Sequence, residues 1–127
     1  MGAELPFKFI TKIIREVRMF RIRRIIKPKS RRDTWTIAGI LKNVCAEYEK
    51  KGRSPATIFI GGFGTPGSEI TVSAEWDQES IETNPRKDVP EIIMSKYSGE
   101  LANLVLSNEI EFYEIATEEK LNQWGVA

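Results

Sequence analysis

The chain of 127 residues has no histidine and only one cysteine, Cys45. The absence of histidine removes the commonest zinc ligand, the usual proximal haem ligand and the commonest general base. Ser-His-Asp triads and Cys-His pairs are therefore excluded within this chain, and we expect no cofactor. A single cysteine cannot form an intramolecular disulfide, which fits a reducing, cytoplasmic location.

Long apolar runs are missing as well. The sequence has no stretch of about 18 apolar residues, so it predicts no membrane-spanning helix. The N-terminus also lacks the continuous apolar segment of a secretory signal. Hydrophobic residues make up 41% of the chain and charged residues 29%, which is typical of a soluble domain with one core.

Charge is unevenly distributed, although the net charge is only +1. Residues 1–53 hold 15 Lys/Arg and 5 Asp/Glu, a balance of +10, whereas residues 54–127 hold 4 and 13, a balance of −9. One interpretation is that basic and acidic strands lie side by side and neutralise each other. The other is that the basic half binds nucleic acid, an anionic membrane or an acidic partner.

Residues 1–18 are basic and amphipathic, with apolar side chains at helical spacing. They predict an N-terminal accessory helix, followed by one domain over residues 19–127. The accessory helix either packs on the domain or on a partner subunit, or it binds an anionic membrane or serves as a transit segment.

Residues 19–27 alternate between arginine and apolar side chains, as a half-buried strand does. The consecutive Arg23 and Arg24 break the alternation and predict a bulge or the end of the strand. After this slip, we expect Ile25 to rejoin the apolar face and Pro28 to end the strand.

The rest of the domain predicts four further elements and a tail. An apolar stripe followed by Gly52 predicts a helix over residues 34–51. Two alternating segments on either side of a glycine-rich turn predict a β-hairpin over residues 55–76. A second helix is expected after Asp88, then a last strand over residues 108–116 and a short helical tail.

This order, β-α-β-β-α-β, predicts an α+β domain of the ferredoxin-like class. Right-handed crossovers give a four-stranded antiparallel sheet with both helices on one face. The other face is expected to carry polar side chains, namely Arg21, Arg23, Thr71, Ser73, Glu75, Glu109 and Glu111. The aromatic residues Phe20, Phe59, Phe63 and Tyr113 do not all fit the helix side, so some of them are expected on this open face. An apolar open face is usually covered by another chain, which predicts a homodimer.

The element order and the segment Ala74-Glu75-Trp76-Asp77, which closes the third strand before a polar loop, resemble the dimeric α/β-barrel superfamily. That group includes NIPSNAP-like proteins, stress-responsive A/B barrel proteins and antibiotic-biosynthesis-type monooxygenases. The resemblance covers residues 19–116 and implies two sheets packed face to face as a barrel. Members that degrade haem use a histidine as the iron ligand, and this chain has none.

In such folds the ligand lies between the sheet and its helices, and this placement selects the candidate site residues. They are Trp35, Asn43, Phe63, Trp76, Arg86, Tyr97 and Asn103. Trp76 and Tyr97 are equally consistent with core positions. The two amides qualify only if they are buried, because a buried amide needs partners. Arg86 is able to bind a carboxylate through both nitrogens, or it is simply solvated.

Residues 61–67 are rich in glycine but lack the Gly-Lys-Ser/Thr ending of a phosphate-binding loop and precede a strand. We therefore reject nucleotide binding and expect the glycines to leave room for a ligand or for a neighbouring backbone. Cys45 lies on an apolar helix face and is expected to be a small buried hydrophobic residue rather than a nucleophile.

Three hypotheses for function remain, the last of them a purely structural domain of a larger assembly. The first is a small homodimer that binds an apolar small molecule, with cofactor-independent monooxygenase or isomerase activity as an extension. Such chemistry would depend on desolvation and on hydrogen bonds from Asn, Tyr or Arg. The second is a non-enzymatic interaction module that uses the basic N-terminal half to bind an acidic partner, a membrane surface or nucleic acid.

Overall fold

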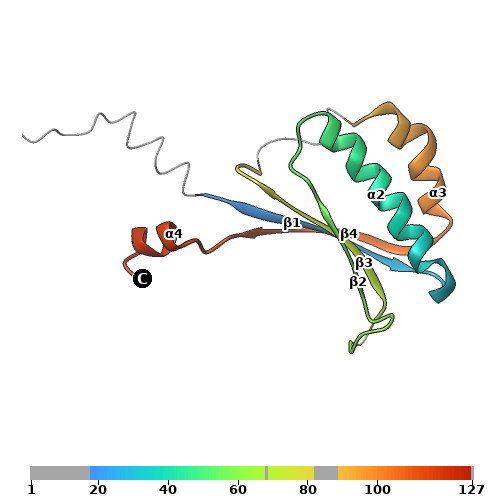
Figure 1. Cartoon of the computed structure of the whole chain (residues 1–127), viewed down its shortest axis with the longest axis horizontal. Coiled ribbons are helices and arrows are strands. Elements are labelled where there is room, and N and C mark those ends of the chain that lie inside the picture. Colours follow the sequence, from blue (N-terminus) through green and yellow to red (C-terminus); the bar gives the residue numbers. More distant parts are fainter. Residues whose placement is uncertain (1–17, 68, 82–88, 127) are drawn as a thin grey trace, which may run out of the picture.

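The computed structural model describes residues 18–67, 69–81 and 89–126. They form one four-stranded sheet with two helices on one face (Figure 1). The elements are β1 (Phe20–Pro28), a 3-10 turn (Arg31–Asp33), α2 (Thr34–Lys50), β2 (Thr57–Gly61), β3 (Thr71–Gln78), a π-helical turn (Ile93–Tyr97) that continues into α3 (Ser98–Ala102), β4 (Val105–Glu114) and α4 (Glu118–Gln123). The predicted element order is confirmed. The predicted N-terminal helix lies outside the described residues, apart from Arg18.

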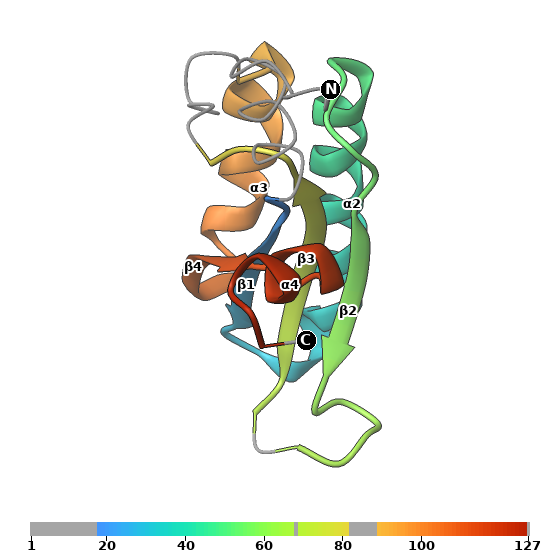
Figure 2. The same cartoon turned by 90° about the vertical axis from the view of Figure 1, so that its left-hand side faces the viewer.

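The strands follow the order β2-β3-β1-β4, and each neighbouring pair is antiparallel. Figure 2 shows this order from right to left, with α3 at the upper left and α2 on the right. β1 is central and pairs with both β3 and β4, so it brings the two crossover units into one sheet. This is the topology of a ferredoxin-like α+β domain.

β1 ends at Pro28 as predicted, but the bulge or strand end predicted at Arg23 and Arg24 is wrong. Arg23 and Arg24 pair in regular register with β3 and β4, and the register shift falls later, between Lys27 and Pro28. The strict alternation therefore continues, and Ile26 rather than Ile25 is the buried residue, with no exposed surface. The alternation survives because Arg24 is accommodated on the helix side, where its guanidinium donates to the Asn108 side chain over 2.7 Å.

The core lies between the sheet and α2. Buried side chains of β1 and β3 meet one face of the helix, and the cluster is made of Phe20, Ile22, Ile26, Ile37, Ala38, Leu41, Cys45, Val72, Ala74 and Trp76. In a second, smaller cluster, Ile40 of α2 packs against Ile93 and Tyr97 of the π-helical turn that precedes α3. Apolar burial of this kind contributes most of the stability of a domain this small.

The bounds of α2, β4 and α4 lie close to those that the sequence predicts. α2 stops where the sequence predicts, because Gly52 has φ of 101° immediately after the helix. β4 begins at Val105, three residues before the predicted start at 108, so Val105 belongs to the sheet rather than to the second helix. The predicted helical tail is confirmed as α4, which Thr117 caps by accepting a hydrogen bond from the Lys120 amide over 3.1 Å.

Candidate functional site

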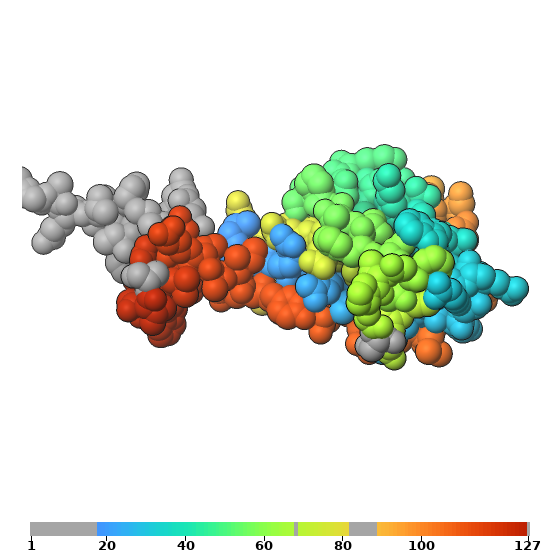
Figure 3. Space-filling model, turned by 60° about the horizontal axis from the view of Figure 1, so that its bottom comes forward, coloured from blue at the N-terminus to red at the C-terminus, as the bar shows by residue number. Residues whose placement is uncertain are grey.

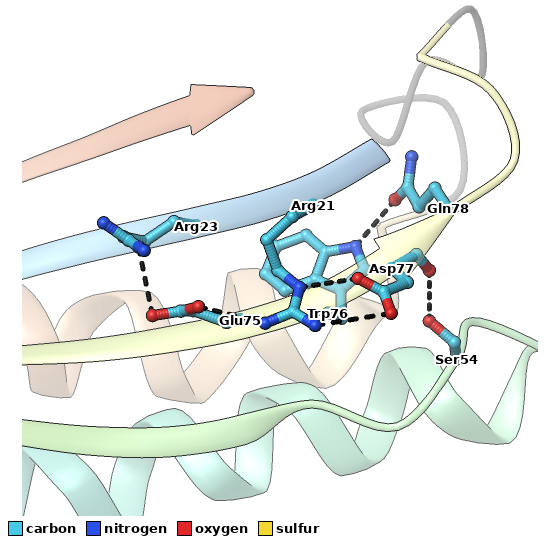
Figure 4. A network of polar contacts seen from close by, with 7 residues as sticks. All are labelled: Arg21, Arg23, Ser54, Glu75, Trp76, Asp77 and Gln78. Carbon is cyan, nitrogen blue, oxygen red and sulfur yellow. Dashed lines mark hydrogen bonds and ion pairs between the residues drawn. The ribbon is translucent and has the colours of Figure 1, made fainter. Parts of the chain in front are cut away.

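The open face of the sheet carries a cross-strand charge network (Figure 4). Arg21 of β1 contacts two carboxylates of β3, with its Nε 2.5 Å from Asp77 Oδ1 and its Nη1 3.3 Å from Glu75 Oε1. Arg23 Nε lies 3.0 Å from the second oxygen of Glu75, so one carboxylate joins both arginines. The hydrogen bonds to Asp77 and then Glu75 raise the pKa of Arg21 above its usual value.

This network explains much of the charge asymmetry along the chain. Lys27 of β1 adds a further pair, with Nζ 3.0 Å from Glu69 Oε2. The basic strand and the acidic strand therefore lie side by side and neutralise each other, as the first interpretation of the charge pattern holds. The β1 cations engaged in this way are not a free basic surface for nucleic acid.

A second group of polar and aromatic side chains lies on the helix side, where α2 ends. We call it the Arg53 corner; it consists of Cys45, Tyr48, Glu49, Arg53 and Trp76. The Arg53 guanidinium carbon is 4.2 Å from the ring centroid of Trp76 and 5.2 Å from that of Tyr48. Both distances are in the range of cation–π contacts.

The Arg53 guanidinium is incompletely satisfied. Its side chain is 14% exposed, and its Nη2 lies 3.6 Å from Glu49 Oε2, an ion-pair distance that is too long for a hydrogen bond. Its Nε and Nη2 are buried and have no hydrogen-bond partner within the described residues. The same Glu49 oxygen accepts a hydrogen bond from the Ala56 amide over 3.1 Å, which holds the start of β2. A buried donor without an acceptor costs about 1–3 kcal/mol.

Two of the titratable neighbours of Arg53, Cys45 and Tyr48, have raised pKa values that favour their neutral forms. Burial raises the pKa of the Cys45 thiol, and the nearby Arg53 guanidinium lowers it by less. Burial also raises the pKa of Tyr48. Cys45 is 4% exposed, so it packs as a small hydrophobic residue and is a poor nucleophile at neutral pH, as expected.

Of the candidate site residues, Trp76 and Tyr97 lie on this side of the sheet, each 9% exposed. Trp76 forms the floor of the Arg53 corner, and its indole N–H donates to Gln78 Oε1 over 2.7 Å (Figure 4). Tyr97 ends the π-helical turn and packs with Ile93 in the second cluster, which also touches Tyr48. Tyr48 therefore packs against the second cluster and also lies within cation–π distance of Arg53. π-helical turns occur frequently at functional sites.

Trp35 and Phe63 meet at the opposite end of the domain, where the β2–β3 hairpin approaches the start of α2. Their ring centroids are 6.3 Å apart in an edge-on arrangement. Arg31 lies over the Phe63 ring at 4.3 Å and donates to its carbonyl oxygen over 3.0 Å. The structure thus brings these two candidates together, but away from Trp76.

The remaining candidates do not join either group. Asn43 on α2 and Asn103 directly after α3 are both exposed, so neither meets the condition of burial that would single out an amide. Arg86 lies outside the described residues. Sequence reasoning missed Arg53 and Tyr48, because an arginine after a helix stop and a tyrosine on a helix face carry no distinguishing pattern.

Known proteins give support for the fold. No family model matches the chain, and no curated protein matches it. A dimeric ferredoxin-like protein from an uncultured marine organism is similar in structure, with a TM-score of 0.54 and 12% identity over 82% of this chain and 93% of that one. A dimeric protein of unknown function with a ferredoxin-like fold from Bacteroides fragilis gives a TM-score of 0.48 and 15% identity over 76% of this chain and 96% of its own. At these identities the marine structure supports the ferredoxin-like fold alone.

Two further features are absent from the described part of the chain, a membrane-spanning helix and a metal site. None of its helices is long and apolar enough to cross a membrane. Within the same residues, no group of three or more His, Cys, Asp or Glu side chains is placed to hold a metal ion.

Proposed function

We propose that this protein binds a small, largely apolar molecule with one oxygen acceptor at the Arg53 corner, and that it does so as a homodimer. The observation that carries the proposal is the Arg53 guanidinium, which is stacked on Trp76 at 4.2 Å and has two buried nitrogens without a hydrogen-bond partner among the residues that the structure describes. A carboxylate or carbonyl oxygen of a ligand would supply the missing acceptor, and the Trp76 and Tyr48 rings would pack against its apolar part.

The corner favours a ligand with at most one negative charge. Glu49 already lies 3.6 Å from Arg53 Nη2, so a more highly charged ligand would meet a nearby carboxylate. Ligands with large polar surfaces are disfavoured by the surrounding Cys45 and Tyr48, which are kept neutral by burial. An aromatic or short aliphatic acid, or the corresponding ketone, satisfies both conditions.

The resemblance to the dimeric α/β-barrel superfamily extends this proposal to a reaction. Cofactor-independent oxygenation or isomerisation would rely on a dry site and on a fixed hydrogen-bond donor near the reacting oxygen. In this chain Arg53 would be the fixed donor, and it would stabilise negative charge that develops on a ligand oxygen.

The proposed dimer interface is the open face of the sheet. Two aromatic side chains lie on that face beside the charge network, Phe59 on β2 and Tyr113 on β4, and they are 45% and 42% exposed. The similar protein from a marine organism is described as dimeric. These observations support a pair of sheets packed face to face as a barrel, with symmetric contacts across a two-fold axis.

Replacing Arg53 by methionine is expected to weaken binding of benzoate by about tenfold to a hundredfold, because a hydrogen bond to a charged group contributes about 1.5–3 kcal/mol. The substitution Arg53→Lys should recover only part of the loss, since lysine has no planar fork. Binding is measured by isothermal titration calorimetry with benzoate, acetophenone and toluene.

The matched control is Arg31→Met, which removes a similar arginine from the Phe63 ring at the far end of the domain. This variant should bind as the unmodified protein does. The expected order of affinity is benzoate, then acetophenone, then toluene. Equal affinity for toluene and benzoate, or an Arg53→Met variant that binds benzoate unchanged, would show that the corner is not the site.

A further inference from the structure

The end of β4 and the helix that follows it form an arm, residues 113–126, that stands away from the two helices of the domain. Figures 1 and 3 show α4 at the far end of the β1–β4 ribbon, separated from α2 and α3. The arm is anchored by a hydrogen bond from the Ile115 amide to the Met19 carbonyl over 2.7 Å. Lys120 adds an ion pair within the arm, 3.3 Å from Glu114.

This arm exposes apolar surface that its own domain does not cover. Trp124 is 74% exposed and Val126 is 70% exposed. α4 has six residues, and isolated helices of fewer than about 12 residues are marginal in water. A partner surface that packs against Trp124 would therefore stabilise the arm.

The distribution of charged residues indicates which partner surface packs against the arm. The arm holds Glu114, Glu118, Glu119 and Lys120, a balance of 1 − 3 = −2. The turn between β1 and α2, residues 29–33, holds Lys29, Arg31, Arg32 and Asp33, a balance of 3 − 1 = +2. Within the described residues, Glu118 and Glu119 of the arm, and Lys29 and Arg32 of the turn, have no partner of opposite charge.

The two charged segments lie at opposite ends of the same strand. β1 starts beside the arm at Phe20 and ends at Pro28, directly before the basic turn. The arm of one molecule therefore cannot reach its own basic turn. A second copy that is turned end over end would bring each arm to the end of the strand that carries its partner's basic turn.

We propose that two copies pair antiparallel, with the acidic arm of each docked on the basic turn of the other. This inference rests on the proposed homodimer and specifies its geometry: the two-fold axis lies between the sheets and runs across the strands. Glu118 and Glu119 face Lys29 and Arg32 of the second copy, and Trp124 packs beside the Trp35–Phe63 pair, where Trp35 is 64% exposed. The same contact is made twice, as a symmetric interface requires.

Charge reversal tests this arrangement. The acidic pair is reversed by Glu118→Arg with Glu119→Arg, and the basic pair by Lys29→Glu with Arg32→Glu. All four side chains are exposed, so folding should be preserved, which circular dichroism checks. Each double variant alone should weaken dimerisation by about tenfold, because like charges then face each other. The quadruple variant should return to within about threefold of the unmodified protein.

Sedimentation velocity over a series of concentrations gives the dissociation constants, at low and at high salt. The effect of each double variant should shrink at high salt, because exposed charges are screened. An unmodified protein that dimerises with the same affinity as both double variants would overturn the antiparallel docking and leave the dimer intact. An unmodified protein that remains monomeric at every concentration would overturn both the proposed dimer and this inference.

Discussion

Replacing Ile26 by alanine is expected to lower the free energy of unfolding by about 3 kcal/mol, within the range of 2–5 kcal/mol for truncation of a large buried aliphatic side chain. Ile26 has no exposed surface and belongs to the main core cluster between the sheet and α2. Truncation removes apolar burial and leaves a cavity that the surrounding strands fill only in part. Urea unfolding at a fixed protein concentration measures the change, since dimerisation links stability to concentration.

Leu106 provides the matched control, because it is an aliphatic residue of β4 that is 71% exposed. Its replacement by alanine should change the free energy of unfolding by no more than about 0.5 kcal/mol. A third variant, Ile25→Ala, distinguishes the observed regular register of β1 from the slip predicted after Arg23. If the strand slipped after Arg23, Ile25 would be the costly position and Ile26 the mild one, which is the opposite of what the register shows.

Replacing Gly62 by alanine is expected to cost about 2 kcal/mol or more, because two effects add at this position. Gly62 has φ of 72°, a backbone conformation that residues with a Cβ atom adopt only under strain. A Cβ atom there would also lie 2.2 Å from the Glu69 carbonyl oxygen, so the hairpin backbone would have to move. Thermal unfolding followed by circular dichroism measures the loss.

Gly64 is the control for this prediction, since it lies in the same turn and a Cβ atom there would meet nothing within 4 Å. The substitution Gly64→Ala should be close to neutral. Equal losses for the two variants would mean that glycine content, rather than the close approach of the two backbones at Gly62, stabilises the hairpin. The contact also settles one expectation for residues 61–67: at Gly62, the space is needed by a neighbouring backbone.

The element order was predictable because each element has its own periodicity. The hairpin alternates strictly, and the stripe and glycine stop of α2 match the observed helix within one residue. The regular pairing of β1 through Arg23 and Arg24 was not predictable in the same way. Arg24 breaks the local apolar pattern, and only the tertiary structure provides the Asn108 side chain that accepts its hydrogen bond on the helix side.

The site was less accessible to sequence reasoning than the fold. Trp76 was selected because it is expected between the sheet and its helices, but its partner Arg53 lies 23 positions earlier, outside any pattern that joins the two. Their contact depends on the turn after α2 and on the β2–β3 pairing, which together place Arg53 over the Trp76 ring. Asn43 and Asn103 were selected but are exposed, since the sequence carries no signal that distinguishes a buried amide from an exposed one on or beside a helix.

The Nε–H group of Arg53 reports directly on whether the guanidinium receives a ligand oxygen. Arginine Nε–H signals in a ¹H–¹⁵N spectrum are to be followed during titration with benzoate, with Arg53→Lys to assign the Arg53 signal and Arg31 as internal control. We predict a saturable shift of the Arg53 signal, smaller with acetophenone and absent with toluene. An Arg53 signal that stays in place while benzoate binds, or that shifts no more than the Arg31 signal, would contradict the proposed function.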